Sequence, residues 1–260
     1  MAPGDSSVLV ESRELTTWIT LNRPERRNAY DAEMVQRVTA AVADTRDDHF
    51  VVITGTQGSF CAGGYLANLA DPKPAELRAM FNGSLRLFDA LRGHPMPVIA
   101  AVNGPAVGGG NELVVACDLA IAARSAYFGQ NGVRIGSAPV LGGTNMLAAS
   151  IGEKRGKEVA FLCRRYPADE ALAMGWINSV VDDDELERAV TETIGELARM
   201  SPRYLEIAKI SSNVWWNQMR DSYATGLGML AQAIGSEDMR EGATAFIEKR
   251  APEFRRLRED

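Results

Sequence analysis

Hydrophobic residues recur along the chain with two different periods, which predict alternating strands and helices. Residues 6–12 and 16–24 alternate between apolar and polar positions, as the two strands of a hairpin do. In residues 31–44, three valines fall on one helical face and Asp31 stands at the N-cap position. The same reasoning predicts further strands at 50–60, 96–104 and 177–181, a helix passing into a strand at 111–123, and further helices at 72–93, 152–165, 168–175 and 184–200.

The order of these elements predicts the fold class. Strands and helices alternate up to about Val181, and from Pro202 onward the pattern is helical throughout. Alternation of this kind is typical of a parallel sheet covered by helices. We therefore expect an α/β core followed by an α-helical C-terminal region.

Composition narrows the possible functions. The 260 residues carry a net charge of −6 without a dense basic cluster, which argues against nucleic acid as a partner. Three widely spaced cysteines argue against a disulfide framework and against a zinc site. Neither a secretion signal nor a stretch of transmembrane length is evident, so we expect a cytoplasmic protein that does not act at a membrane.

The positions of the two histidines argue against histidine-based chemistry. The chain has two histidines, His49 and His94, and each directly precedes an apolar run that predicts a strand. Neither has a nucleophile or a second metal ligand nearby in sequence, and we expect both to be structural. Any chemistry must then come from carboxylates, backbone amides, hydroxyls or an added cofactor.

The stretch "NGPAVGGGNEL" offers such chemistry. Gly108 to Gly110 lie between an apolar run and a helical pattern, and Glu112 follows in the first helical turn. A helix N-terminus exposes N–H groups without partners, which suit an oxygen that becomes negative. Glu112 beside such donors would suit proton transfer to and from an enolate. The alternative is a tight contact between helix and sheet with a surface glutamate.

A second glycine-containing segment, "GSFCAGGYLANLA" at 58–70, also follows a predicted strand. Amides from the two loops could together hold one carbonyl oxygen. Neither segment has the spacing of a dinucleotide-binding fingerprint or of a phosphate loop.

With these two segments, the chain resembles the crotonase (enoyl-CoA hydratase/isomerase) superfamily. The segments "LNRPERRNAYDAEM", "FGQNGVRIGSAPVLGGTNML", "ADEALAMGWINSVV" and "EGATAFIEKRAPEF" extend the resemblance in order from about residue 8 to 256. It implies a spiral α/β core of repeated ββα units at 1–200. It also implies a helical region at 201–260 for trimerisation and contact with coenzyme A, in a homotrimer or a dimer of trimers.

The resemblance also implies roles for individual residues. The N–H groups of Ala62 and Gly109 would form an oxyanion hole for an acyl-CoA thioester, with Glu112 as the acid/base group. Coenzyme A would enter as part of the substrate, and no tightly bound cofactor or metal is implied. The residues implied to line coenzyme A are Arg26, Arg27, Ala29, Cys61, Gly63, Leu66, Phe246 and Lys249. Those implied to contact the acyl group are Tyr65, Asn131, Gly132 and Ser137.

The sequence departs from the usual hydratase pattern at Gly132, where a second glutamate would stand. There it resembles a branch containing 1,4-dihydroxy-2-naphthoyl-CoA synthase and 2-ketocyclohexanecarboxyl-CoA hydrolase, in which bicarbonate can occupy the gap. Of that branch's catalytic side chains only Ser137 is present. The positions of the other catalytic side chains correspond to Ala160, Pro139 and a place near Ile234, so those side chains are absent from this sequence.

Three functions therefore remain open. The first is an enoyl-CoA hydratase, dehydratase or isomerase that uses Glu112. The second is a β-oxoacyl-CoA hydrolase or other C–C bond enzyme centred on Gly132 and Ser137. The third is a catalytically idle subunit that binds coenzyme A.

Overall fold

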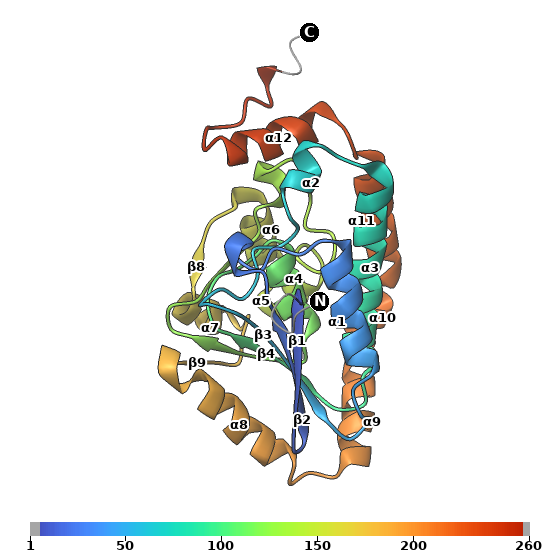
Figure 1. Cartoon of the computed structure of the whole chain (residues 1–260), viewed down its shortest axis with the longest axis vertical. Coiled ribbons are helices and arrows are strands. Elements are labelled where there is room, and N and C mark those ends of the chain that lie inside the picture. The colour runs from blue at the N-terminus through green and yellow to red at the C-terminus, as the bar shows by residue number, and fades with distance from the viewer. Residues whose placement is uncertain (1–5, 257–260) are drawn as a thin grey trace.

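The computed structural model describes residues 6–256, and this part of the chain contains a six-stranded sheet flanked by helices (Figure 1). The order across the sheet is β1–β2–β3–β4–β6–β9. Only the edge strand β1 is antiparallel to its neighbour within this described sheet. The bounds are β1 (Val8–Arg13), β2 (Thr16–Leu21), β3 (Phe50–Gly55), β4 (Val98–Val102), β6 (Leu119–Ala123) and β9 (Ser179–Val181). The predicted hairpin and the predicted α/β class are confirmed.

Helices cover both faces of the sheet, so its central strands are buried on both sides. Ile53 of β3 belongs to the larger core, which includes side chains of α1 (Ala32–Ala43) and α3 (Pro74–Gly93). Its neighbour Val52 belongs to a second core with α8 (Leu186–Leu197) on the other face. Because successive side chains of a strand point to opposite faces, such a strand needs apolar residues at every position. This explains the unbroken apolar runs in the sequence.

Helix starts follow the capping signals in the sequence. Asp31 accepts a hydrogen bond from the Met34 N–H at 3.0 Å, as its predicted N-cap position requires. A proline stands in the first turn of α3, where its missing N–H costs nothing. The remaining helices of the core are α2 (Ala67–Ala70), α4 (Gly109–Ala116), α5 (Met146–Ile151), α6 (Glu153–Leu162) and α7 (Ala168–Met174).

A second, three-stranded sheet has the order β5–β7–β8. Its strands are β5 (Ala106–Val107), β7 (Tyr127–Gly129) and β8 (Tyr166–Pro167). They are too short to produce a recognisable period, and the sequence pattern did not predict them. The Gly108 N–H donates to the Gly129 carbonyl at 2.9 Å, so this sheet fixes the turn directly before α4.

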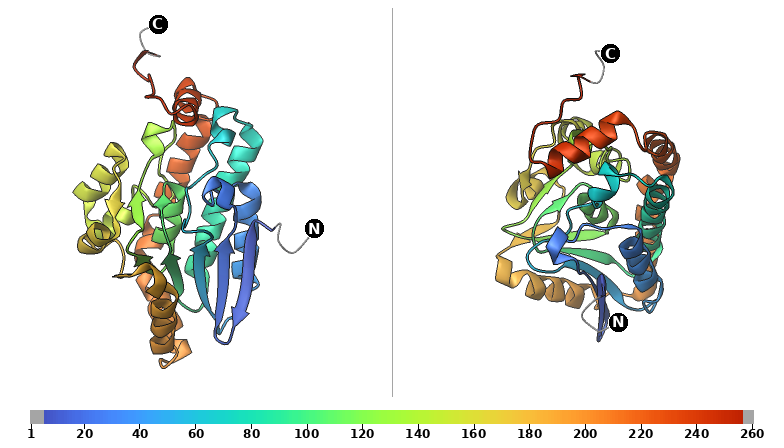
Figure 2. Two further views of the ribbon diagram at one scale, coloured as in Figure 1. Left: turned by 60° about the vertical axis from the view of Figure 1, so that its left-hand side comes forward. Right: turned by 45° about the horizontal axis from the view of Figure 1, so that its top comes forward.

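In the part of the chain that the structure describes, four helices follow the core, as predicted for the residues after Pro202. They are α9 (Pro202–Ser212), α10 (Val214–Gln218), α11 (Arg220–Gln232) and α12 (Glu237–Ile247). α9 to α11 lie on the same side of the molecule as α1 and α3, and α12 turns across α2 (Figures 1 and 2). The division of the chain at residue 200 stays a prediction.

A buried ion pair attaches these helices to the core. Lys209 Nζ lies 2.8 Å from Asp118 Oδ2 and donates to the carbonyls of Leu91 and Met96. Asp118 also accepts from the Val98 N–H at 2.8 Å. The pair thus joins α9 to the end of α3, the start of β4 and the turn between α4 and β6.

Several single-residue expectations are also resolved. His49 and His94 are buried and hydrogen-bonded at the sheet, in agreement with structural roles. All three cysteines are free and buried. Trp216 is 3% exposed and belongs to the core, whereas Trp215 is 56% exposed. No helix in residues 6–256 combines the length and the apolar character that crossing a bilayer requires.

Candidate functional site

Close packing explains two of the three glycines before Glu112, and backbone conformation explains the third. A Cβ atom on Gly109 would lie 1.8 Å from the Tyr30 hydroxyl oxygen, and one on Gly110 would lie 2.1 Å from the Cys61 carbonyl oxygen. Gly108 has φ 55° and ψ −125°, a conformation that favours glycine. A larger residue at position 109 or 110 would push α4 away from the chain beneath it.

The second glycine loop lies directly against the first. The Val107 N–H donates to the Cys61 carbonyl at 3.1 Å, and the Cys61 N–H donates to the Pro105 carbonyl at 3.0 Å. A Cβ atom on Gly63 would lie 2.9 Å from the Gly109 nitrogen. The two segments that the sequence singled out therefore meet at the N-terminus of α4.

The available amides differ from the predicted ones. The Ala62 N–H donates to the Arg27 carbonyl at 3.0 Å, so its hydrogen is already used inside the chain. The Gly64 and Gly109 N–H groups donate to no acceptor among residues 6–256. The assignment of an oxyanion donor to Ala62 therefore needs correction, and the neighbouring free amide in the same loop is that of Gly64.

Glu112 is 6% exposed and is held by backbone amides. Its Oε1 accepts hydrogen bonds from the N–H groups of Leu141 at 2.7 Å and Gly143 at 3.3 Å. Burial raises the pKa of Glu112 to about 7, although the two amides oppose the shift. Oε2 accepts no hydrogen bond from the described residues. A buried carboxyl that exchanges its proton near neutral pH suits acid/base chemistry.

Two buried amide side chains lie near Glu112, and the sequence pattern gave no signal for either. A Cβ atom on Gly143 would lie 2.4 Å from Gln130 Nε2, and neither polar atom of Gln130 has a partner in the described chain. Asn111 accepts from Trp176 Nε1 at 3.0 Å, while its own Nδ2 has no partner among the same residues. Unpartnered polar groups in an interior are rare and often mark a functional site.

Gly132 lies close against a later part of the same loop. Gly132 begins the 3₁₀ helix η2 (Gly132–Arg134), and a Cβ atom there would lie 3.0 Å from Pro139 Cδ and 3.2 Å from Ala138. The Ser137 N–H donates to the Gly132 carbonyl at 2.9 Å and closes this turn. A side chain at position 132 would therefore press against Pro139 and Ala138, and the binding of bicarbonate beside Gly132 stays a prediction.

Six of the eight residues implied to line coenzyme A belong to the loop at 58–70 or to the segment at 26–29 that is hydrogen-bonded to it. Arg26 pairs with Asp31 at 2.7 Å, and its guanidinium carbon lies 4.7 Å from the centre of the Tyr65 ring. Cys61 is fully buried, with its Sγ 3.2 Å from the Asn28 carbonyl, so its side chain offers no surface to a ligand. Arg27 is exposed, Leu66 is half-buried, and Ala29 and Gly63 are buried.

Asn28 was missed at the sequence level, although it holds this edge together. It is fully buried with φ 57°, and its Nδ2 donates to the carbonyls of Ser59 at 2.7 Å and Thr56 at 3.1 Å. Its Oδ1 accepts from the Arg23 N–H at 2.9 Å. The available signal was its residue type, because asparagine tolerates a left-handed conformation better than most residues.

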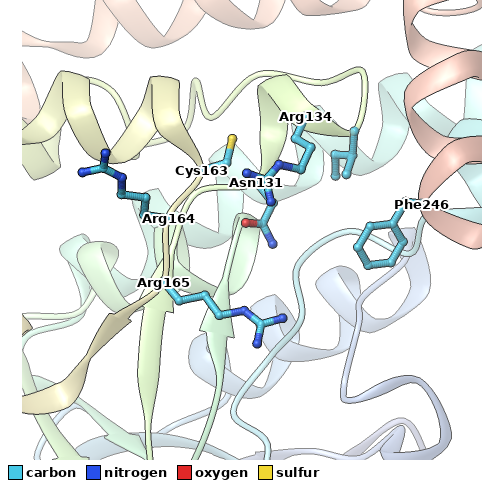
Figure 3. A pocket seen from close by; sticks show the side chains of 7 residues that line it. Asn131, Arg134, Cys163, Arg164, Arg165 and Phe246 are labelled. Atoms are coloured by element: carbon cyan, nitrogen blue, oxygen red, sulfur yellow. The ribbon is translucent and has the colours of Figure 1, made fainter. Parts of the chain in front are cut away.

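Asn131 and Phe246 lie together on a separate wall of the site region. Both line a cavity of about 560 Å³ between η2, the turn from α6 to β8, and α12 (Figure 3). Lys249 follows α12 with φ 57° and is exposed. No group of three potential metal-ligating side chains occurs in residues 6–256.

Comparison with known proteins agrees with this arrangement. The family model described as enoyl-CoA hydratase/isomerase matches residues 12–257. The chain therefore belongs to the enoyl-CoA hydratase/isomerase family, part of the crotonase superfamily.

Solved structures of similar proteins cover nearly the whole chain. An enoyl-CoA hydratase from Mycobacterium avium subsp. paratuberculosis is 28% identical with a TM-score of 0.87, over 96% of this chain and 98% of that one. An enoyl-CoA hydratase from Bacillus anthracis is 32% identical with a TM-score of 0.77, over 95% and 98%. An enoyl-CoA hydratase/isomerase from Xanthobacter autotrophicus is 28% identical with a TM-score of 0.81, over 94% and 97%.

Proposed function

We propose that the protein adds water across the C2–C3 double bond of enoyl-CoA thioesters, with Glu112 as its one acid/base group. The observation that carries this proposal is the environment of Glu112. Its carboxyl group is buried, is oriented by two backbone amides, and has a pKa of about 7. It also stands in the first turn of the helix whose N-terminal amide is free.

The free amides of Gly64 and Gly109 supply the electrostatic part of the reaction. They would donate to the thioester oxygen, which becomes negative when the double bond is attacked. The N-terminal end of α4 adds a partial positive charge at the same place. Removal of one such donor typically costs about 3–4 kcal/mol in the transition state.

Glu112 supplies the proton transfers. As a carboxylate it takes a proton from water, and the resulting hydroxide attacks C3 while the C2–C3 electron pair moves toward the thioester oxygen. The enolate then collapses, and C2 takes the proton back from the Glu112 carboxyl. The sum of the steps is the addition of one water molecule, and one carboxyl group serves as base and then as acid. The same group could move a proton along the acyl chain, which would isomerise the double bond.

The alternatives have less support. Ring cleavage of a β-oxoacyl-CoA was expected to use a base or water beside Gly132, where Pro139 and Ala138 lie close to the backbone. An idle subunit has no need for a buried carboxyl with a pKa near neutral beside free amides. Both observations favour hydration.

We also propose that the chain self-associates, as its resemblance to the family implies. α9 and α10 expose large apolar side chains on the isolated chain, between 52% and 70% exposed. Exposed apolar surface of this kind is typical of subunit contacts. The residues are Tyr204, Ile207, Ile210 and Trp215.

Turnover of crotonyl-CoA tests the proposal directly. We expect the wild-type protein to remove the absorbance of the conjugated thioester and Glu112→Gln to be slower by at least about a hundredfold, because general acid/base groups typically contribute that much. Glu196→Gln, an exposed change on α8, is the matched control and should keep the wild-type rate.

The result that contradicts the proposal is equally specific. Wild-type turnover that survives Glu112→Gln would assign the chemistry to another group. No turnover by the wild type, despite binding of the thioester, would favour a different acyl-CoA reaction.

A further inference from the structure

Tyr30 connects the two loops that meet at the N-terminus of α4. Its N–H donates to the Gly63 carbonyl at 2.8 Å, and its carbonyl accepts from the Tyr65 N–H at 2.9 Å. These two bonds form an isolated parallel bridge between Tyr30 and Gly64. The Gly64 N–H itself donates to no acceptor in residues 6–256. The backbone of Tyr30 therefore holds the chain on both sides of an amide that is available to a ligand.

The bond to the Gly63 carbonyl also fixes the direction of the Gly64 N–H. A trans peptide unit is planar, and its C=O and N–H groups point in opposite directions. Because the Gly63 carbonyl points at the Tyr30 N–H, the Gly64 N–H points away from Tyr30. Tyr30 is itself held at the start of α1, where the next residue, Asp31, caps the helix. The direction of this donor thus depends on a hydrogen bond from Tyr30.

The side chain of Tyr30 contacts the other donor residue. A Cβ atom on Gly109 would lie 1.8 Å from the Tyr30 hydroxyl oxygen, 2.7 Å from its Cζ and 3.0 Å from its Cε1. The hydroxyl is therefore the part of the side chain closest to this position. From the second loop, a Cβ atom on Gly63 would lie 2.9 Å from the Gly109 nitrogen. Gly109 is thus packed against both the Tyr30 hydroxyl and the backbone of the second loop.

The core beside the Tyr30 side chain is incompletely filled. A cavity of about 10 Å³ lies next to it and is lined by side chains of α1, α3 and α4, among them Val35, Phe88 and Leu113. Removal of the Tyr30 hydroxyl would enlarge the unfilled space, because core side chains relax only partly into a gap. The first turn of α4 would then lose a contact that limits its movement.

The Tyr30 hydroxyl is uncharged at neutral pH. Burial raises its pKa, and the negative charge of Glu112 raises the pKa further. The hydroxyl therefore adds no charge beside the two amides and does not share the proton transfers of Glu112. Its contribution must come from its position.

We infer that Tyr30 is a positioning residue, which sets the separation and direction of the Gly64 and Gly109 amides that bind the thioester oxygen. The inference rests on the proposed acyl-CoA function, in which those amides act on the thioester. Donors to a developing charge work only when they are aimed at the place where the charge forms. Misplacement of a catalytic group by about 1 Å can cost roughly a hundredfold in rate. A hydroxyl packed against one donor can thereby affect the reaction.

Infrared spectroscopy of a bound, unreactive thioester tests the placement of the two amides. Butyryl-CoA labelled with ¹³C at the thioester carbonyl has no double bond to hydrate. Its C=O stretching frequency falls when the carbonyl oxygen accepts hydrogen bonds. We expect the wild-type protein to lower this frequency, and Tyr30→Phe to give about half of that shift or less, because one of the two donors is displaced.

Turnover should change in the same direction. With crotonyl-CoA, we expect Tyr30→Phe to lower kcat by roughly tenfold and to change KM by less than about threefold, because the donors act mainly in the transition state. A hydroxyl that only stabilises the fold would change neither kcat nor the carbonyl frequency of the bound thioester.

Tyr166→Phe is the matched control. Tyr166 of β8 is 4% exposed, and its hydroxyl has no partner among residues 6–256. The same atom is removed from a buried ring, which packs against Trp176 with 5.8 Å between ring centres. This variant should keep the wild-type frequency shift and kcat. If Tyr30→Phe does not fold, Tyr30→Leu replaces it with the same expected losses, since leucine suits the apolar lining of the cavity.

Three results would overturn the inference. A wild-type frequency shift and kcat in Tyr30→Phe would reduce the hydroxyl to a packing group. Equal losses in Tyr166→Phe would show a general effect of removing a buried hydroxyl. A wild-type protein that leaves the carbonyl frequency of bound butyryl-CoA unchanged would show that the two amides do not bind the thioester oxygen.

The infrared measurement is independent of turnover. A frequency shift that Tyr30→Phe reduces, together with inactivity toward crotonyl-CoA, would reject hydration and keep the role of Tyr30. Hydration of crotonyl-CoA with equal frequency shifts and equal kcat in the two proteins would do the reverse.

Discussion

At the residue scale, the central feature is that Glu112 is buried yet bound by backbone amides. Burial disfavours its charged form, while the Leu141 and Gly143 N–H groups favour it. Burial is the larger effect, and the pKa of Glu112 rises from 4.5 to about 7. A group with this pKa can act as base and acid within one reaction cycle at neutral pH.

The raised pKa of Glu112 predicts how stability depends on pH. Between pH 4.5 and 7 the folded protein holds a proton at Glu112 that the unfolded chain has lost. Its free energy of unfolding therefore falls as pH rises through this window, by up to about 3 kcal/mol. Glu112→Gln stays neutral and should avoid this loss. Urea unfolding should give similar free energies of unfolding for the wild type and Glu112→Gln at pH 5. At pH 8 the value for Glu112→Gln should be higher than that of the wild type.

The same experiment contains its own control. Glu196→Gln should show no such gain between the two pH values, because its side chain is exposed. If Glu112→Gln is no more stable than the wild type at pH 8, the carboxyl group is not destabilised by burial.

Sequence reasoning singled out two loops that meet in the structure, but it did not identify which amides are free there. It pointed to Glu112 and both glycine segments, because residue type and position in the chain suffice for that. It assigned a donor to Ala62, whose amide is already used, because which amide is free depends on tertiary contacts with Arg27. It expected space beside Gly132, but that depends on the path of residues 138–139.

At the scale of elements, α12 fixes the loop that holds Glu112. A Cβ atom on Gly242 of α12 would lie 2.3 Å from the Gly136 nitrogen, so helix and loop touch backbone to backbone. Five and seven residues further along that loop are Leu141 and Gly143, whose amides bind Glu112. The position of α12 therefore influences the carboxyl group.

Gly242→Ala tests this connection. The added methyl group must move α12 or the loop, and overpacking of this kind typically costs about 1–3 kcal/mol of stability. We expect hydration to slow by roughly tenfold, because misplacement of a catalytic group lowers the rate without removing it. We also expect the midpoint of the pH–rate profile to rise, because weakened N–H bonds favour the protonated carboxyl.

Gly195→Ala on α8 provides the matched control. A Cβ atom there meets nothing within 4 Å, so the change should be neutral or slightly stabilising. An unchanged pH–rate midpoint in Gly242→Ala would show that α12 does not act on Glu112.

The long elements were predictable and the short ones were not. α1, α3 and α8 each bury one face, so their apolar residues repeat with the helical period. β5, β7 and β8 have two or three residues each and exist because distant segments pair with one another. A local pattern of that length contains no period to detect.

At the scale of the whole molecule, the Lys209–Asp118 pair is a buried polar link between the C-terminal helices and the core. Asp118→Asn should lower the free energy of unfolding by about 3 kcal/mol, because it leaves the buried Lys209 ammonium group uncompensated. Urea unfolding measures this loss.

An exposed pair serves for comparison. Arg220 pairs with Asp89 but is 56% exposed, and Arg220→Gln should cost less than about 1 kcal/mol. Equal costs for the two substitutions would show that the Lys209–Asp118 pair is not energetically important.

The contact between α12 and the Gly136 turn also has a consequence for biosynthesis. A ribosome makes the chain from its N-terminus, and domains tend to fold as they emerge. Glu112 and the loop that binds it are synthesised about a hundred residues before Gly242. The nascent chain can form its sheet early, but the loop around the carboxyl group gains its final support only when α12 has left the ribosome. Completion of the site is thereby delayed until about a hundred residues beyond the loop have been made.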